Sequence, residues 1–202
     1  VLVGHSERRT IHNESDDVLN AKVKAAFKHG ITPVLCVGEG LEIRQAGTHV
    51  SHTLDQLRAG VAGLTNEQAA ELVVAYEPVW AIGTGEVAGP GDAQEMCAAI
   101  RAELETLFDA GTAAKTRLLY GGSVKANNAA AILKERDVDG LLVGGASLDP
   151  TEFANIVRFE SHLVADSSVP VRALPSAPLP ERPSWTFFLS FCRSSWASPA
   201  SC

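Results

Sequence analysis

Five short apolar runs recur along the first 165 residues, and polar positions do not alternate with apolar ones inside them. The runs occupy residues 1–3, 31–37, 72–76, 117–120 and 140–143. A continuous apolar run of this length is typical of a parallel β-strand that is covered on both faces. The pattern therefore predicts five parallel strands.

Helical periodicity appears between these runs. Residues 16–29 place Leu19, Val23 and Ala26 on one face, and Gly30 follows as a stop signal. A second helix is predicted over 48–61, a third from Asp92 to a stop near Gly111, and a fourth after the cap and first-turn proline at Asp149 and Pro150. Strand and helix thus alternate as a β/α repeat.

Two α/β architectures arise from such a repeat, an open doubly wound sheet and a closed eight-stranded barrel. The predicted strands start about 35 residues apart, close to the roughly 31 residues per unit of a barrel with eight units. Five units are too few to close a barrel. We therefore expect an incomplete one that lacks about three strands at its front.

The composition changes abruptly after residue 165. Residues 166–202 contain six of the ten prolines and nine serines. A segment this rich in proline and serine favours an extended, solvated chain over a packed one. We predict a folded domain over 1–165 and a disordered tail over 166–202.

Charge and cysteine usage exclude several classes of protein. The formal net charge is -7 over 202 residues, and an acidic surface repels nucleic-acid backbones while still allowing a small anion to bind locally. No apolar run approaches the roughly 18 residues of a membrane span, and no targeting leader opens the chain. The four cysteines lie far apart, which argues against a zinc site. We expect a cytoplasmic protein with no metal, no nucleic-acid partner and no membrane partner.

Residues that could act in catalysis or ligand binding directly follow four of the five predicted strands, at positions 4–9, 77–85, 121–123 and 144–147. Ligands of α/β proteins bind at the carboxyl ends of the strands. His5 begins a short helix, whose positive end favours the neutral imidazole, and Glu77 ends an apolar strand, where burial increases basicity. Either side chain could instead be purely structural.

Glycine-rich loops supply a candidate anion site. Backbone N–H groups at Gly83, Gly144 and Gly145 can approach an anion closely, and Ser123 can add a hydroxyl donor. The alternative is that these glycines only turn the chain. Their equivalent positions after successive strands favour the anion site.

Four motifs together resemble the triosephosphate isomerase family, in the same order and spacing. They are GHSERR at 4–9, AYEPVWAIGTG at 75–85, YGGSV at 120–124 and LVGGASL at 142–148, and the resemblance extends to about residue 164. It implies a TIM (β/α)8 barrel, of which this chain holds strands four to eight. It also implies interconversion of dihydroxyacetone phosphate and glyceraldehyde 3-phosphate through an enediolate, in glycolysis and gluconeogenesis, without a cofactor.

The resemblance assigns a role to each candidate residue. It implies that Glu77 is the base, that neutral His5 polarises the substrate carbonyl, and that residues 78–85 form a lid. This pairing of a glutamate with a neutral histidine is already known for the family. The phosphate would be bound by Gly83, Ser123, Gly144 and Gly145.

Two segments of the family pattern have no counterpart in this sequence. One is the first strand, which supplies an Asn and a Lys to the active site, and the other is the loop that forms the homodimer interface. The second hypothesis is therefore a non-catalytic barrel fragment or an interaction module. A third, another phosphate-binding barrel enzyme, would need a Schiff-base lysine at a strand end, and Lys125 follows its strand by several residues.

Overall fold

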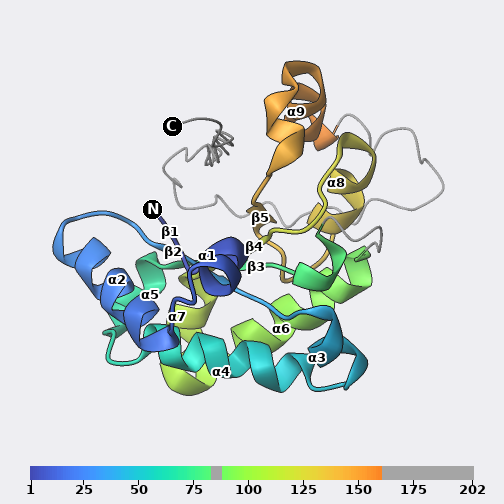
Figure 1. Cartoon of the computed structure of the whole chain (residues 1–202). Helices are drawn as coiled ribbons and strands as arrows, with labels where there is room; N and C mark the ends of the chain where they lie inside the picture. Colours follow the sequence, from blue (N-terminus) through green and yellow to red (C-terminus); the bar gives the residue numbers. More distant parts are fainter. Residues whose placement is uncertain (83–87, 161–202) are drawn as a thin grey trace, which may run out of the picture.

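The computed structural model describes residues 1–82 and 88–160 (Figure 1). Gly83, the end of the predicted lid at 78–85 and the predicted tail at 166–202 lie outside the described residues.

The described residues form a parallel sheet with helices between its strands. The strands are β1 (Leu2–Val3), β2 (Val34–Val37), β3 (Val73–Tyr76), β4 (Arg117–Tyr120) and β5 (Gly140–Leu141). The α-helices are α1 (Ser6–Ile11), α2 (Asp16–Lys28), α3 (Leu41–Gln45), α4 (His49–Val61), α5 (Asn66–Glu71), α6 (Pro90–Leu107), α7 (Ala110–Lys115), α8 (Ala126–Leu133) and α9 (Pro150–Val157), with short 3-10 turns η1 (Val79–Ala81) and η2 (Gly145–Leu148).

The sheet runs in sequence order from β1 to β5, and every neighbouring pair is parallel. Val34 pairs with Val73, and Val73 pairs in turn with Arg117. A parallel neighbour requires a crossover connection, which the intervening helices provide. The predictions of an α/β fold and of five parallel strands are confirmed.

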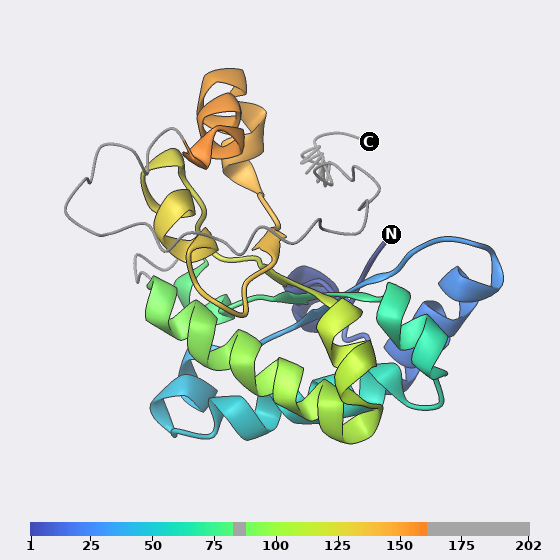
Figure 2. The same cartoon turned by 180° about the vertical axis from the view of Figure 1, so that it is seen from behind.

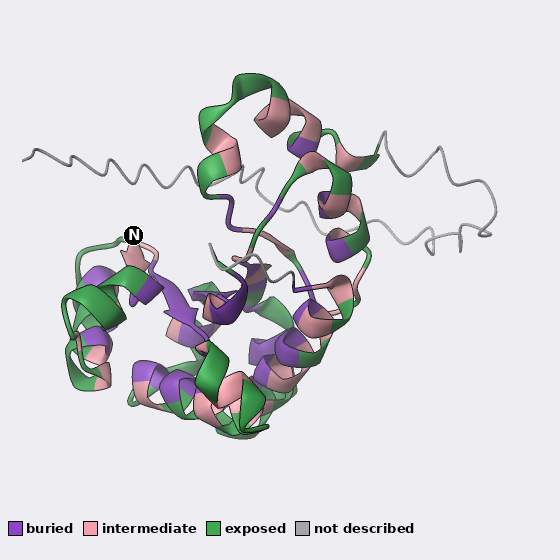
Figure 3. Cartoon of the chain, turned by 45° about the vertical axis from the view of Figure 1, so that its right-hand side comes forward, coloured by how far each residue is buried: buried purple, intermediate pink, exposed green. Residues whose placement is uncertain are grey.

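Side chains along the strands alternate between two apolar clusters. Leu35, Val74 and Leu118 join the larger cluster, which includes buried side chains of α2, α4 and α6. Val34, Cys36, Val73, Ala75 and Leu142 form a smaller cluster with Leu2 and Leu119. Successive residues of a strand point to opposite faces, so β1 to β4 each contribute to both clusters, and Leu141 and Leu142 divide between them at the end of β5. Figure 3 shows buried positions on the strands and on the sides of the helices that face them.

The long helices α4 and α6 lie along the same side of the sheet, with α2 against α4 (Figures 1 and 2). Helices α8 and α9 pack against each other near β5. None of the helices in residues 1–82 and 88–160 is long and apolar enough to cross a membrane.

Capping groups define where the helices begin. Ser15 caps α2. Asp149 caps α9, as predicted, and its carboxylate accepts from the backbone N–H groups of Thr151 and Glu152. The predicted third helix was wrong at both ends. It begins at Pro90, and Asp92 lies inside its first turn and accepts from the Gly89 N–H at 2.8 Å. It ends at Leu107, because Asp109 caps a separate helix, α7, which contains Gly111.

Candidate active site

His5 lies between β1 and α1, where a glycine turn directs it towards the sheet. Gly4 has φ of 77°, a left-handed conformation that favours glycine. His5 is the N-cap of α1, and its Nδ1 accepts from the backbone N–H of Glu7 at 3.4 Å. A ring nitrogen that accepts carries no proton, so the hydrogen-bond network assigns the imidazole proton to Nε2.

Glu77 follows β3 directly and is only 2% exposed. Its Oε1 lies 3.0 Å from Nε2 of His5, and its Oε2 accepts from the backbone N–H of Ser6 at 2.9 Å. Burial raises the pKa of the Glu77 carboxyl, although His5, the Ser6 N–H and Arg9 act in the opposite direction. The site therefore contains a carboxylate that is more basic than an exposed glutamate.

Glycines on both neighbouring strands leave space for Glu77. A Cβ on Gly38, just after β2, would lie 1.8 Å from the main-chain oxygen of Glu77. A Cβ on Gly121, just after β4, would lie 3.2 Å from Cγ of Glu77. The backbone of Glu77 is therefore held on one side by Gly38, and its side chain has a close neighbour in Gly121.

The glycine loops after β4 and β5 line the same cavity as His5 and Glu77. This cavity has a volume of ≈ 710 Å³ and includes Ser123, Gly144 and Gly145 in its lining. A Cβ on Gly144 or Gly145 would meet no atom within 4 Å, so the backbone there borders open space. Five of the six predicted site residues thus line one cavity, and the sixth, Gly83, lies outside the described residues.

A buried glutamate that the sequence reasoning missed anchors the start of the predicted lid. Glu39 is fully buried and accepts from the Tyr76 hydroxyl at 3.1 Å and from Trp80 Nε1 at 2.9 Å. Burial raises the pKa of Glu39, and these hydrogen bonds oppose the rise. Glu39 follows the second apolar run, so the rule that identified the other strand ends would have found it together with Gly38.

Two further observations concern the residues around the cavity. Lys125 lines the cavity as well, which its distance from β4 along the chain had not indicated. Across residues 1–82 and 88–160, no group of three His, Cys, Asp or Glu side chains could hold a metal ion.

Comparison with known proteins relates this arrangement to one family. The family model described as triosephosphate isomerase matches residues 1–160. A triosephosphate isomerase of Streptomyces coelicolor is 61% identical over 159 residues, which cover 79% of this chain and 62% of the relative. One of Cutibacterium acnes is 57% identical over 159 residues, covering 79% and 61%, and one of Rhodococcus jostii is 58% identical over 156 residues, covering 77% and 60%.

The chain therefore spans about three fifths of the length of these curated relatives. The family match covers most of the chain and includes the strand ends that carry His5, Glu77 and the two glycine loops. On this evidence, the chain belongs to the triosephosphate isomerase family.

Proposed function

We propose that this chain is a triose-phosphate isomerase that interconverts dihydroxyacetone phosphate and glyceraldehyde 3-phosphate. One observation carries the proposal: buried Glu77 lies 3.0 Å from His5 Nε2, in a cavity that is also lined by glycine loops. A base, a carbonyl-polarising group and an anion site are the three elements that this proton transfer needs.

Glu77 is the proposed base. Its carboxylate removes a proton from the carbon next to the substrate carbonyl, and the electron pair of the broken C–H bond forms the enediolate. The same carboxyl then returns the proton to the neighbouring carbon, while His5 transfers the hydroxyl proton from one enediolate oxygen to the other. Burial supports this role, because it raises the pKa of Glu77 towards the range in which a carboxylate is an effective base.

His5 is the proposed electrophile, and its tautomer supports the role. Because Nδ1 accepts from the Glu7 N–H, Nε2 is the nitrogen that carries the proton in the neutral imidazole. In the free protein this N–H is directed at Glu77 Oε1. A substrate carbonyl oxygen that enters between the two groups would take over the N–H, and the developing oxyanion would be stabilised by it.

The phosphate group would bind at Ser123, Gly144, Gly145 and Gly83. The open backbone at Gly144 and Gly145 supports this assignment, since main-chain N–H groups can reach an anion there. Residues 78–85 would act as the lid that excludes water from the enediolate. Glu39 would hold its first residues through Trp80.

The position of these loops also supports a place for the five strands in a TIM barrel. The phosphate site of such barrels follows strands seven and eight, and here the glycine loops follow β4 and β5. We therefore take β1 to β5 as strands four to eight. The proposed isomerase domain covers 1–165 and the tail 166–202, and the family homodimer and a cytoplasmic location are further parts of the proposal.

The test is isomerisation in D₂O by the purified 202-residue chain, followed by NMR. We expect deuterium to enter the product at the carbon beside the carbonyl, faster than without protein, and we expect Glu77→Gln to abolish the acceleration. Inorganic phosphate should still perturb the Gly144 and Gly145 amide resonances in that variant. Phosphate binding without any turnover by the unmodified chain would instead support a non-catalytic fragment.

A further inference from the structure

Gln56 binds both polar groups of a single residue at the end of β2. From the inner face of α4, its Oε1 accepts from the Gly38 N–H at 2.9 Å, and its Nε2 donates to the Gly38 carbonyl at 3.1 Å. Nε2 also lies 3.0 Å from His52 Nε2, which therefore acts as an acceptor. These contacts satisfy the amide of Gln56, which is only 9% exposed, and fix its orientation.

Gly38 in turn contacts the backbone of Glu77. The Cβ that Gly38 lacks would lie 1.8 Å from the Glu77 carbonyl oxygen and 2.7 Å from its carbonyl carbon. On the preceding residue, the Val37 carbonyl accepts from the Glu77 N–H at 2.8 Å. Gln56 therefore binds the same strand end, Val37 and Gly38, that contacts the main chain of Glu77.

We propose that Gln56 is a positioning residue for Glu77: it fixes the Gly38 peptide, and the Gly38 backbone fixes the position from which the Glu77 carboxylate reaches the cavity. This inference rests on the proposed role of Glu77 as the base. Gln56 itself does not line the cavity, so it acts through Gly38 and contacts no substrate.

The chemistry of the contact explains why the residue is a glutamine. A backbone N–H and a backbone C=O need one acceptor and one donor, and a side-chain amide supplies both without a charge. Glutamate would keep the acceptor but would oppose the Gly38 carbonyl with a second oxygen. Methionine has a similar length and would leave both backbone groups unsatisfied.

The test uses the full 202-residue chain with Gln56→Met and Gln56→Glu. Asn20→Leu is the matched control, because the Asn20 amide also binds backbone, donating to the carbonyls of Gly60 and Ala62 at 2.9 and 3.0 Å. It too should lower the melting temperature, but it is not in contact with Gly38 or Glu77. A loss of stability alone is therefore common to the variants, whereas a change at Glu77 is specific to Gln56.

Two measurements report on Glu77. The first is the NMR titration of the carboxyl carbon of Glu77, labelled with ¹³C and assigned by its loss in Glu77→Gln. In folded Gln56→Met we expect its midpoint to move towards that of an exposed glutamate, whereas Asn20→Leu leaves it unchanged. The second is turnover: kcat should fall about 10-fold to 10²-fold with little change in KM, because a small misplacement of a base affects the chemical step and not phosphate binding. Gln56→Glu should lie between Gln56→Met and the unmodified chain.

The carboxyl titration separates this inference from the proposed function. If the unmodified chain has no isomerase activity, the proposed function fails, and the Glu77 midpoint still decides whether Gln56 positions the carboxylate. An unchanged midpoint in both folded Gln56 variants overturns the inference. It is also overturned if neither Gln56 variant folds while Asn20→Leu does, because Gln56 would then contribute only to stability.

Discussion

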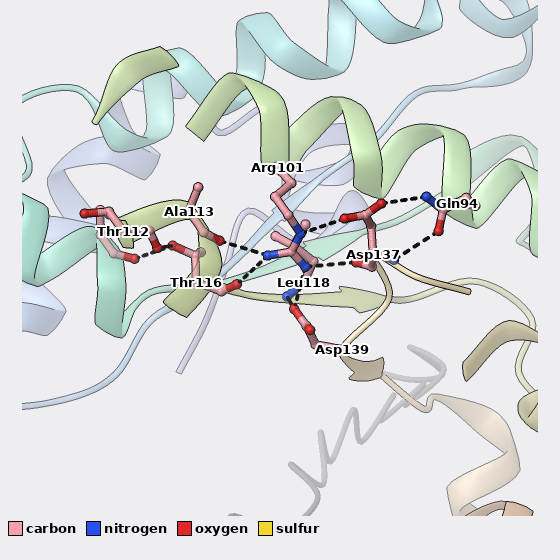
Figure 4. A network of polar contacts seen from close by, with 9 residues as sticks. Gln94, Arg101, Thr112, Ala113, Thr116, Leu118, Asp137 and Asp139 are labelled. Atoms are coloured by element: carbon pink, nitrogen blue, oxygen red, sulfur yellow. Dashed lines mark hydrogen bonds and ion pairs between the residues drawn. The ribbon is translucent and has the colours of Figure 1, made fainter. Parts of the chain in front are cut away.

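Replacing Arg101 by methionine should destabilise the chain strongly without touching the cavity. Arg101 on α6 uses all five of its N–H donors (Figure 4). Nε donates to the Asp137 carboxylate at 2.9 Å and Nη2 to the Asp139 carboxylate at 2.8 Å. The remaining bonds go to the carbonyl groups of Ala113, Thr116 and Asp137. One side chain thus joins α6, the end of α7 and the segment that leads into β5.

The structure allows the magnitude to be worked out. A hydrogen bond to a charged group contributes about 1.5–3 kcal/mol, and Arg101 makes two such bonds to carboxylates. The Arg101 side chain is 20% exposed and that of Asp139 is 34% exposed, so water replaces part of the loss. We expect Arg101→Met to lower the free energy of unfolding by about 3 kcal/mol.

Urea unfolding followed by circular dichroism measures this loss from the shift in midpoint at constant slope. Arg58→Met is the matched control. Arg58 also pairs with two carboxylates, Asp55 and Glu103, but its side chain is 45% exposed. Exposure of the cation weakens such pairs, and Arg58 makes no bond to the carbonyls that Arg101 holds, so the control should shift the midpoint by clearly less than Arg101→Met. Equal shifts in the two variants, or no measurable shift in Arg101→Met, would refute the reasoning.

Three further predictions concern Glu77 and its surroundings. Glu77→Asp withdraws the carboxylate by about 1 Å and should reduce turnover on the order of 10²-fold, while the melting temperature stays nearly constant. A lower melting temperature with unchanged turnover would contradict the role of Glu77 as the base. Because burial raises the pKa of Glu77 from 4.5, its protonated form favours folding and this contribution is lost as pH rises through the raised pKa. Urea unfolding should therefore show the stability of Glu77→Gln increasing relative to the unmodified chain above about pH 4.5, and a constant difference from pH 4 to 8 would count against it. Gly38→Ala would place a methyl 1.8 Å from the Glu77 oxygen and should lower both turnover and melting temperature, whereas Gly40→Ala, which meets no atom within 4 Å, should alter neither.

Local sequence patterns predicted the strands, the longer helices and most of the candidate site, whereas α3, α5, α7 and α8 were not predicted. Continuous apolar runs identified the five strands of residues 1–82 and 88–160, and the spacing of Leu19, Val23 and Ala26 identified α2. These signals are readable because the burial of a strand or helix face repeats with the period of that element. Helix ends follow less directly from the sequence: a helix start at Asp92 is predicted, but its carboxylate accepts from the Gly89 N–H from within the first turn of a helix that begins at Pro90.

Tertiary structure decided which of these elements hold one another in place. Gln56 and Gly38 are 18 residues apart, and Arg101 and Asp137 are 36 apart. The partners of polar side chains on helix faces cannot be predicted from the sequence pattern, because hydrophobic periodicity indicates which helix face is buried but not which residues pack against it. The contact of Gly38 with Glu77 exists only because β2 and β3 are paired in one register. The sequence therefore determined which residues could carry the chemistry, and the packing of parallel strands and helices decided how the base is positioned.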